Sequence, residues 1–181
     1  MKRREGLVAV GLAIALFAIN LGIARYERLL QNGTRVLLPL QQYDPRALLQ
    51  GDYMAIDYDD ESRIHDALVA DACGRRGRVC GGVTTQDEIV IDHDGYAVFR
   101  LDARDIGRFV RVQSGAMPLK RHEVAVRVRL RGYRTDIAGN AWFFPEGQGA
   151  HFANARYGEL RVADDGTALL AGLYDRDRNR L

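Results

Sequence analysis

Two aspartates and two tyrosines close together are the side chains of this sequence best suited to acid–base chemistry. Asp52, Tyr53, Asp57 and Tyr58 lie in the stretch LLQGDYMAIDYDD, residues 48–60. A carboxylate can act as a general base and a phenol as a general acid or oxyanion donor. An enzyme would therefore use Asp52 or Asp57 as the base, with one of the tyrosines as its partner.

The same residues have a structural interpretation that needs no catalysis. Gly51 would end a short helix in the left-handed conformation, and Asp52 would accept hydrogen bonds from backbone amides at the corner. The tyrosine rings would pack while their hydroxyl groups find partners. No histidine or nucleophile is fixed nearby in the sequence. We therefore expect this stretch to serve structure or ligand docking, with no catalytic residue.

A row of arginines is a second candidate site. Arg127, Arg129 and Arg131 alternate with apolar residues in RHEVAVRVRLR, residues 121–131, and so share the outer face of a strand. Such a row is common on a solvated sheet face, where it also discourages edge-to-edge pairing. The functional alternative is a surface for an anionic ligand of the cell envelope, such as a lipid headgroup, a glycan phosphate or an acidic partner.

A glycine-rich segment, residues 143–152 (FFPEGQGAHF), is a third candidate. It lacks the lysine and the glycine spacing of a phosphate-binding loop. Its aromatic beginning favours a plug for the core, whereas its length favours a binding loop on a rigid sheet. The residues proposed for that loop are Trp142, Phe144, Pro145, Glu146 and Gly147.

Metal and redox chemistry have little support. Cys73 and Cys80 are the only cysteines, and a disulfide between them suits an oxidising compartment. A metal site would need further ligands, and two free thiols are the remaining alternative. The four histidines share no ligand spacing, so we expect no metal and no cofactor; they are His65, His93, His122 and His151.

The elements that position these residues begin with an apolar segment. Residues 6–23 contain no charge, and about 20 apolar residues cross a bilayer core of roughly 30 Å. Lys2, Arg3 and Arg4 precede the segment, which places the N-terminus in the cytoplasm and the rest of the chain across the membrane. A cleaved signal peptide and a buried helix are the alternatives.

The remaining chain reads as one α+β domain with a mainly antiparallel sheet and one or two short helices. At 181 residues, with 47% hydrophobic and 28% charged residues, the composition is globular. The net charge of +2 gives no case for nucleic acid as a partner. We expect an anchor over residues 1–25, a spacer over 26–34, the domain over 35–176 and a frayed charged tail over 177–181.

Hydrophobic patterning predicts the individual elements. Strands are expected at 34–41, 52–58, 121–131, 141–144, 158–162 and 167–174, with helices at 44–51 and 60–72. Pro39 predicts an edge position for the first strand. Residues 88–102 are expected to form a hairpin, with Asp94 and Gly95 as its turn.

The sequence GDYMAIDY, residues 51–58, resembles the signature of the GDYXXLXY domain family, with Ile56 where the family prefers leucine. The segments YDPRALLQ and WFFPEGQG also resemble family sequence, and the resemblance runs from residue 36 to residue 174. It implies a bacterial protein held in the inner membrane, often encoded beside multi-pass membrane proteins, with no established activity. The motif implicates Gly51, Asp52, Tyr53 and Tyr58 without a catalytic role.

Together these features predict a single-pass anchor carrying a periplasmic domain that binds a membrane-protein partner. The recognition surface would combine residues 51–58 with the loop at 143–152. The alternatives are a periplasmic hydrolase or peptide-processing enzyme that uses Asp52 or Asp57, and an envelope module that binds anionic ligands through the arginines.

Overall fold

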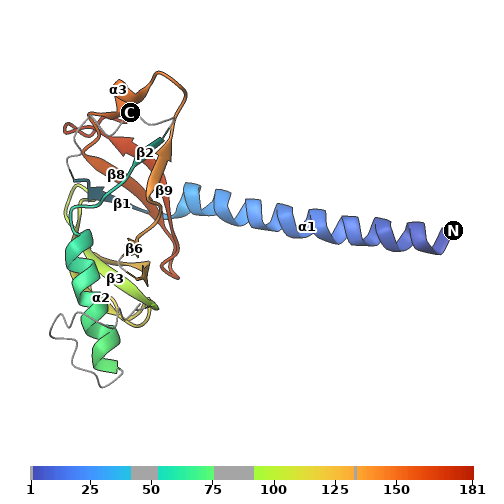
Figure 1. Cartoon of the computed structure of the whole chain (residues 1–181), viewed down its shortest axis with the longest axis horizontal. Coiled ribbons are helices and arrows are strands. Elements are labelled where there is room, and N and C mark those ends of the chain that lie inside the picture. The colour runs from blue at the N-terminus through green and yellow to red at the C-terminus, as the bar shows by residue number, and fades with distance from the viewer. Residues whose placement is uncertain (1, 42–52, 76–91, 133) are drawn as a thin grey trace, which may run out of the picture.

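The computed structural model describes residues 2–41, 53–75, 92–132 and 134–181, and every structural statement below concerns these residues. A long helix, α1 (Lys2–Asn32), stands out from a folded head domain, residues 34–181 (Figure 1). The head extends to both sides of the end of α1, with α3 near one extreme and α2 near the other. The fold is α+β, as the sequence predicts.

Helix α1 is the one described helix that is long and apolar enough to cross a membrane. The candidate span is Val10–Asn32, and none of its most apolar window is buried against the head domain. Residues 26–32, where a spacer is expected, continue the helix. They do so because Leu29 is only 7% exposed where it meets the head, and its carbonyl accepts a 2.8 Å hydrogen bond from the N–H of Gly33.

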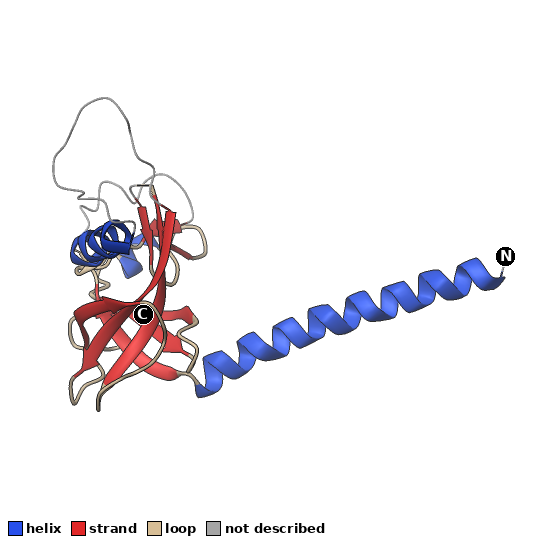
Figure 2. Cartoon of the chain, turned by 90° about the horizontal axis from the view of Figure 1, so that it is seen from below, coloured by secondary structure: helices blue, strands red, loops and turns tan. Residues whose placement is uncertain are grey.

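Three antiparallel sheets make up the head (Figure 2). The largest has the order β4-β3-β5-β6 and carries helix α2 on one face. A second sheet has the order β1-β8-β9, and a third pairs β2 with β7. The bounds are β1 Thr34–Pro39, β2 Tyr53–Ala55, α2 Glu61–Arg75, β3 Asp92–Leu101, β4 Gly107–Gln113, β5 Glu123–Arg131, β6 Arg134–Asp136, β7 Ala141–Phe143, α3 Gly149–Phe152, β8 Tyr157–Val162 and β9 Ala168–Tyr174.

One core joins the three sheets and α2. The alternation in β5 is as expected for Val126, Val128 and Leu130, which are fully buried, whereas the three arginines of the same strand are exposed. Ile64 and Leu68 close the core from α2. Pro39 lies on β1, which is an edge strand of its sheet, so the interpretation of this proline is confirmed.

The expected hairpin at residues 88–102 is wrong where the structure describes it. Asp94 and Gly95 lie within the continuous strand β3 and pair with Arg129 and Val128 of β5. Gly95 is needed for a close approach and not for a turn, because a Cβ there would lie 2.8 Å from Cδ2 of Leu68. The glycine therefore lets α2 pack onto the sheet.

The expectation of a frayed C-terminal tail is also wrong. The Asp175 side chain accepts hydrogen bonds from the backbone N–H and the Nδ2 of Asn179, at 2.8 and 3.0 Å. This turn brings Leu181 back to β9, where its N–H donates to the carbonyl of Leu173 at 2.9 Å and its side chain packs against the core. The charges of the tail stay in solvent while its backbone is paired.

Candidate functional site

The family-like motif and the glycine-rich segment meet in one small sheet. Strand β2 contributes Tyr53 and strand β7 contributes Phe143, and these two residues are direct partners in the antiparallel register. Their rings lie 5.9 Å apart between centroids, although Tyr53 is 50% exposed and Phe143 is 76% exposed. We call this pair the aromatic surface. The two segments that the sequence analysis combines, residues 51–58 and 143–152, are thus adjacent at this one pair of residues.

The opposite face of β2 and the residues after it are buried. Met54, Ile56 and Tyr58 all belong to the core, so the predicted alternation is confirmed. Tyr58 is 2% exposed, and its hydroxyl donates a 3.2 Å hydrogen bond to the carbonyl oxygen of Gly139. Burial raises the pKa of this phenol above its ordinary value, with the charge of Glu61 adding to the effect. Tyr58 is thus a neutral structural donor.

Of the two residues proposed as general bases, Asp57 is the one that the structure describes. Gly51 and Asp52 lie outside the described residues. Asp57 is half-buried, and it contributes to raising the pKa of the nearby Glu61 carboxyl, which burial raises more strongly. The carbonyl of Asp57 accepts a 2.9 Å hydrogen bond from the N–H of Gln41, beside the antiparallel bridge between Leu40 and Tyr58.

Asp60 performs a local task that the sequence did not reveal. Its carboxylate accepts hydrogen bonds from the backbone N–H of Phe109 at 3.0 Å and from Arg63 at 2.6 Å. It therefore ties the start of α2 to strand β4. Phe109 is 49 positions from Asp60, so the sequence around Asp60 gives no sign of this hydrogen bond. Only the tertiary fold reveals the role of Asp60.

The loop after β7 is partly core and partly surface. Phe144 stacks on Phe152 with centroids 5.0 Å apart, and Trp142 lies 6.4 Å from the same ring. Pro145, Glu146 and Gly147 are exposed beyond this cluster. The Nε1 atom of Trp142 is buried with no hydrogen-bond partner among the described residues. The aromatic residues Trp142 and Phe144, proposed for a binding loop, thus pack with Phe152, as the core-plug interpretation expects, whereas a binding role for the exposed residues stays a prediction.

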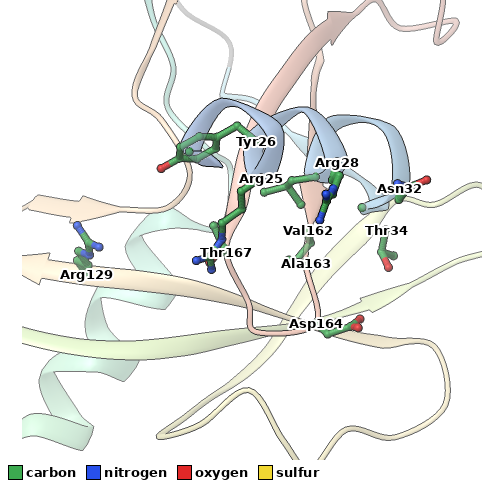
Figure 3. Close-up of a pocket in the computed structure, with 13 residues that line it drawn as sticks. Arg25, Tyr26, Arg28, Asn32, Thr34, Arg129, Val162, Ala163, Asp164 and Thr167 are labelled. Atoms are coloured by element: carbon green, nitrogen blue, oxygen red, sulfur yellow. The ribbon is translucent and has the colours of Figure 1, made fainter. Parts of the chain in front are cut away.

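The arginine row is uneven in charge. Arg131 and Arg127 both reach Asp94 on the neighbouring strand β3, at 2.9 and 3.5 Å between nitrogen and oxygen. Arg129 forms no ion pair with any described residue. It instead contributes to a cavity of about 680 Å³ between the end of α1 and the head domain (Figure 3). The row is therefore one partly neutralised surface with one unpaired cation.

Sequence reasoning missed this cavity because its walls come from distant segments. Helix α1 supplies Arg25, Tyr26 and Arg28, as Figure 3 shows, and the head supplies Arg129. Arg25 also forms a 3.1 Å ion pair with Asp165 in the turn between β8 and β9. The remaining lining residues are Gly22, Leu29, Asn32, Gly33, Thr34, Val162, Ala163, Asp164 and Thr167.

Cysteines and histidines form no metal site in the described part of the chain. Cys73 is buried near the end of α2, and its expected disulfide partner, Cys80, lies outside the described residues. His93 contacts Asp71 at 2.8 Å, and His65 contacts the hydroxyl of Thr135 at 3.1 Å. No group of three potential metal ligands occurs among the residues searched.

Comparisons with known proteins agree with the motif. The sequence model of the GDYXXLXY proteins matches residues 15–173, which covers part of α1 and nearly the whole head domain. No curated protein and no solved structure matches the chain. The matched range includes the motif strand β2 and its partner β7, so it contains both halves of the aromatic surface. The chain therefore belongs to the GDYXXLXY protein family.

Proposed function

We propose that this protein is a membrane-anchored recognition protein whose aromatic surface, Tyr53 and Phe143, binds a multi-pass membrane protein. The carrying observation is the exposure of two paired aromatic rings on strands from the two family-like segments. Aromatic side chains often contribute most of the binding energy at protein interfaces. A pair of rings that stays exposed to solvent contributes little to the stability of the fold, so its exposure favours a role in binding. The proposed activity is binding without catalysis.

The proposed topology supplies the setting for that binding. Helix α1 would cross the bacterial inner membrane with Lys2, Arg3 and Arg4 in the cytoplasm and the head domain in the periplasm. In that oxidising compartment Cys73 and Cys80 would form a disulfide. The apolar length of α1 and its exposure support this arrangement.

The shape of the molecule favours a partner in the same membrane. The head extends sideways from the end of α1, so an upright helix would hold the head along the bilayer surface (Figure 1). A surface held there meets neighbouring membrane proteins at high local concentration. The family resemblance supports the same kind of partner.

An enzymatic function has weaker support. A tyrosine acid or oxyanion donor must reach the substrate, whereas the Tyr58 hydroxyl is buried and engaged with the carbonyl of Gly139. The exposed Tyr53 has an aromatic neighbour in place of a base. Asp57 remains the acidic candidate among the described residues.

Site-specific photo-crosslinking in living cells tests the proposal. A photoreactive phenylalanine at position 143 should crosslink an integral membrane protein that also co-purifies with the full chain in mild detergent. The double variant Tyr53→Ser/Phe143→Ser should lose co-purification while its melting temperature stays unchanged, because both side chains are exposed.

The matched control is Met117, which is 68% exposed outside the aromatic surface. Met117→Ser should retain the partner, and a photoreactive residue at 117 should not crosslink it. A chain that purifies alone, or a partner kept by the double variant, would contradict the proposal. Alkaline extraction of the membranes tests the anchor separately.

A further inference from the structure

We propose that the cavity between α1 and the head domain binds the phosphate headgroup of an anionic phospholipid. This junction cavity is lined by Arg25, Arg28 and Arg129 among the residues given above (Figure 3). The inference rests on the membrane anchoring proposed above and is independent of the aromatic surface.

The first support is the depth of the cavity in the proposed membrane. The uncharged segment ends at Ile23, and an α-helix rises about 1.5 Å per residue. Arg25 and Arg28 then lie about 3 and 7.5 Å beyond the hydrocarbon core. The polar layer of each leaflet is roughly 5 to 8 Å thick, so both guanidinium groups reach the level of lipid phosphates.

The second support is unbalanced positive charge. Neither Arg28 nor Arg129 has an ion-pair partner within the described chain, and Arg28 is exposed on α1. Arg25 is partly neutralised by its ion pair with Asp165. The pKa of the Asp165 carboxyl is lowered mainly by the hydrogen bond from the N–H of Thr167, with a smaller contribution from the charge of Arg25. Asp164 is the acidic side chain of the lining itself. The lining thus carries three arginines and one carboxylate, while Asp165 pairs with Arg25, and Asp94 and Asp136 lie opposite Arg129 on the neighbouring strands without an ion pair to it.

The third support is the order of apolar and polar residues along the cavity: the end nearer the uncharged segment of α1 is apolar, and the end nearer the head is polar. Gly22 borders the cavity within the uncharged segment, and no atom beyond its chain neighbours and the local helix backbone lies within 4 Å of where its Cβ would be. This open position gives an acyl chain a way along α1. At the opposite end the lining carries Asn32, Thr34 and Thr167, whose polar groups can donate to phosphate or glycerol oxygens. Tyr26 stands between them, at the interfacial depth that tyrosines favour.

The volume of the cavity and its apolar side favour a phosphate that belongs to a lipid over a free phosphate ion. A volume of about 680 Å³ falls within the range of small-molecule sites and accommodates a headgroup with the start of its chains. A free phosphate would use the arginines but would leave the apolar side of the cavity empty. We therefore assign the cavity to a lipid and make soluble phosphate an outcome of the test.

The test uses the full chain in nanodiscs that contain equal amounts of phosphatidylglycerol and phosphatidylcholine. Native mass spectrometry of the released protein should find phosphatidylglycerol retained in preference to phosphatidylcholine. The variant Arg28→Gln/Arg129→Gln should lose most of that preference, since each interfacial arginine contributes about fivefold in binding. Arg108→Gln, an exposed arginine of β4 outside the cavity, should behave as the original protein.

Each contrary result has a separate meaning. Equal retention of the two lipids, or an equal loss in the Arg108→Gln control, would overturn the inference while leaving the anchor intact. Saturable binding of inorganic phosphate in pure phosphatidylcholine nanodiscs, lost in the double variant, would overturn the lipid assignment in favour of a soluble ligand. A chain that does not enter nanodiscs would contradict the proposed anchor, and the inference with it.

Discussion

Leu68 of α2 packs so closely on Gly95 of β3 that a methyl group added to the glycine would lie 2.8 Å from Cδ2 of the leucine. Contacts of that length do not occur without movement of the helix or of the side chain. The glycine therefore leaves room for the buried Leu68 side chain between α2 and the sheet.

Gly95→Ala should lower the free energy of unfolding by about 1–3 kcal/mol, the usual cost of overpacking a well-filled core. Chemical denaturation of the full chain in detergent measures the change. The matched control is Gly74→Ala in α2, where no atom beyond its chain neighbours and the local helix backbone lies within 4 Å of the new Cβ. That substitution should stabilise by about 0.4–1 kcal/mol. A neutral Gly95→Ala would contradict the close packing.

This contact also explains why sequence reasoning failed over part of the chain. Asp-Gly between apolar residues is a strong hairpin signal, and nothing local distinguishes a glycine that turns the chain from one that admits a helix. Asp94 is equally ambiguous, because its partners Arg127 and Arg131 lie on another strand. The short strands β4 and β6 were missed for a related reason, since their pairing partners rather than their own sequences define them.

Glu123 should make stability depend on pH in the acid range. Arg111 donates to its buried carboxylate at 2.9 Å, and the N–H of Lys120 does so at 3.0 Å. These donors, Arg111 first, lower its pKa from 4.5 to about 2. Because the unfolded chain takes up the proton at the higher pH, this stabilisation is complete above pH 4.5 and is lost as the pH falls toward 2.

Denaturation of Glu123→Gln across that range provides the measurement. The variant should be less stable than the original protein near neutral pH, and the two should converge as the pH falls toward 2. Glu146→Gln, on the exposed loop after β7, should give a curve parallel to the original. Parallel curves for Glu123→Gln as well would show that the pairing with Arg111 does not persist in solution.

Tyr58 should prove to be a structural residue of the family motif. Tyr58→Phe removes the hydrogen bond to the carbonyl of Gly139, an exposed residue, and should cost about 0.5–1.5 kcal/mol, the usual net value of one hydrogen bond. Tyr58→Ala also empties the core and should cost about 3–5 kcal/mol. Both values come from equilibrium unfolding. Retained partner co-purification by folded Tyr58→Phe would separate this role from recognition, whereas lost binding at full stability would contradict it.

The C-terminal residue should contribute to stability. Leu181 is half-buried against the core after the turn at residues 175–179. Leu181→Ser should therefore lower the free energy of unfolding by about 1 kcal/mol, part of the value of a fully buried leucine. Arg176→Ser, exposed in the same turn, should change it little. Thermal unfolding of both variants distinguishes a packed end from a frayed one.

The candidate site was only partly predictable. The alternation of Met54, Ile56 and Tyr58 with Tyr53 follows from the period of a strand, so the exposed tyrosine was identifiable from sequence alone. Its neighbour Phe143 begins the segment expected beside it but was not among the loop residues proposed for binding, because the sequence does not state the register that pairs the two rings. The junction cavity could not be predicted from the sequence, because Arg28 and Arg129 are 101 positions apart and line the same cavity only through the packing of α1 on the head.

Helix α1 runs without a break to Asn32 and then enters β1 after a single residue, Gly33. Helix α1 and the head are thus joined without a flexible linker between them. Successive residues of an α-helix are rotated by about 100°, so inserting one residue between Ile23 and Arg25 would turn the whole head by that angle about the helix axis. The direction in which Tyr53 and Phe143 point around the axis of α1 consequently depends on the number of residues in α1 and not on the head itself.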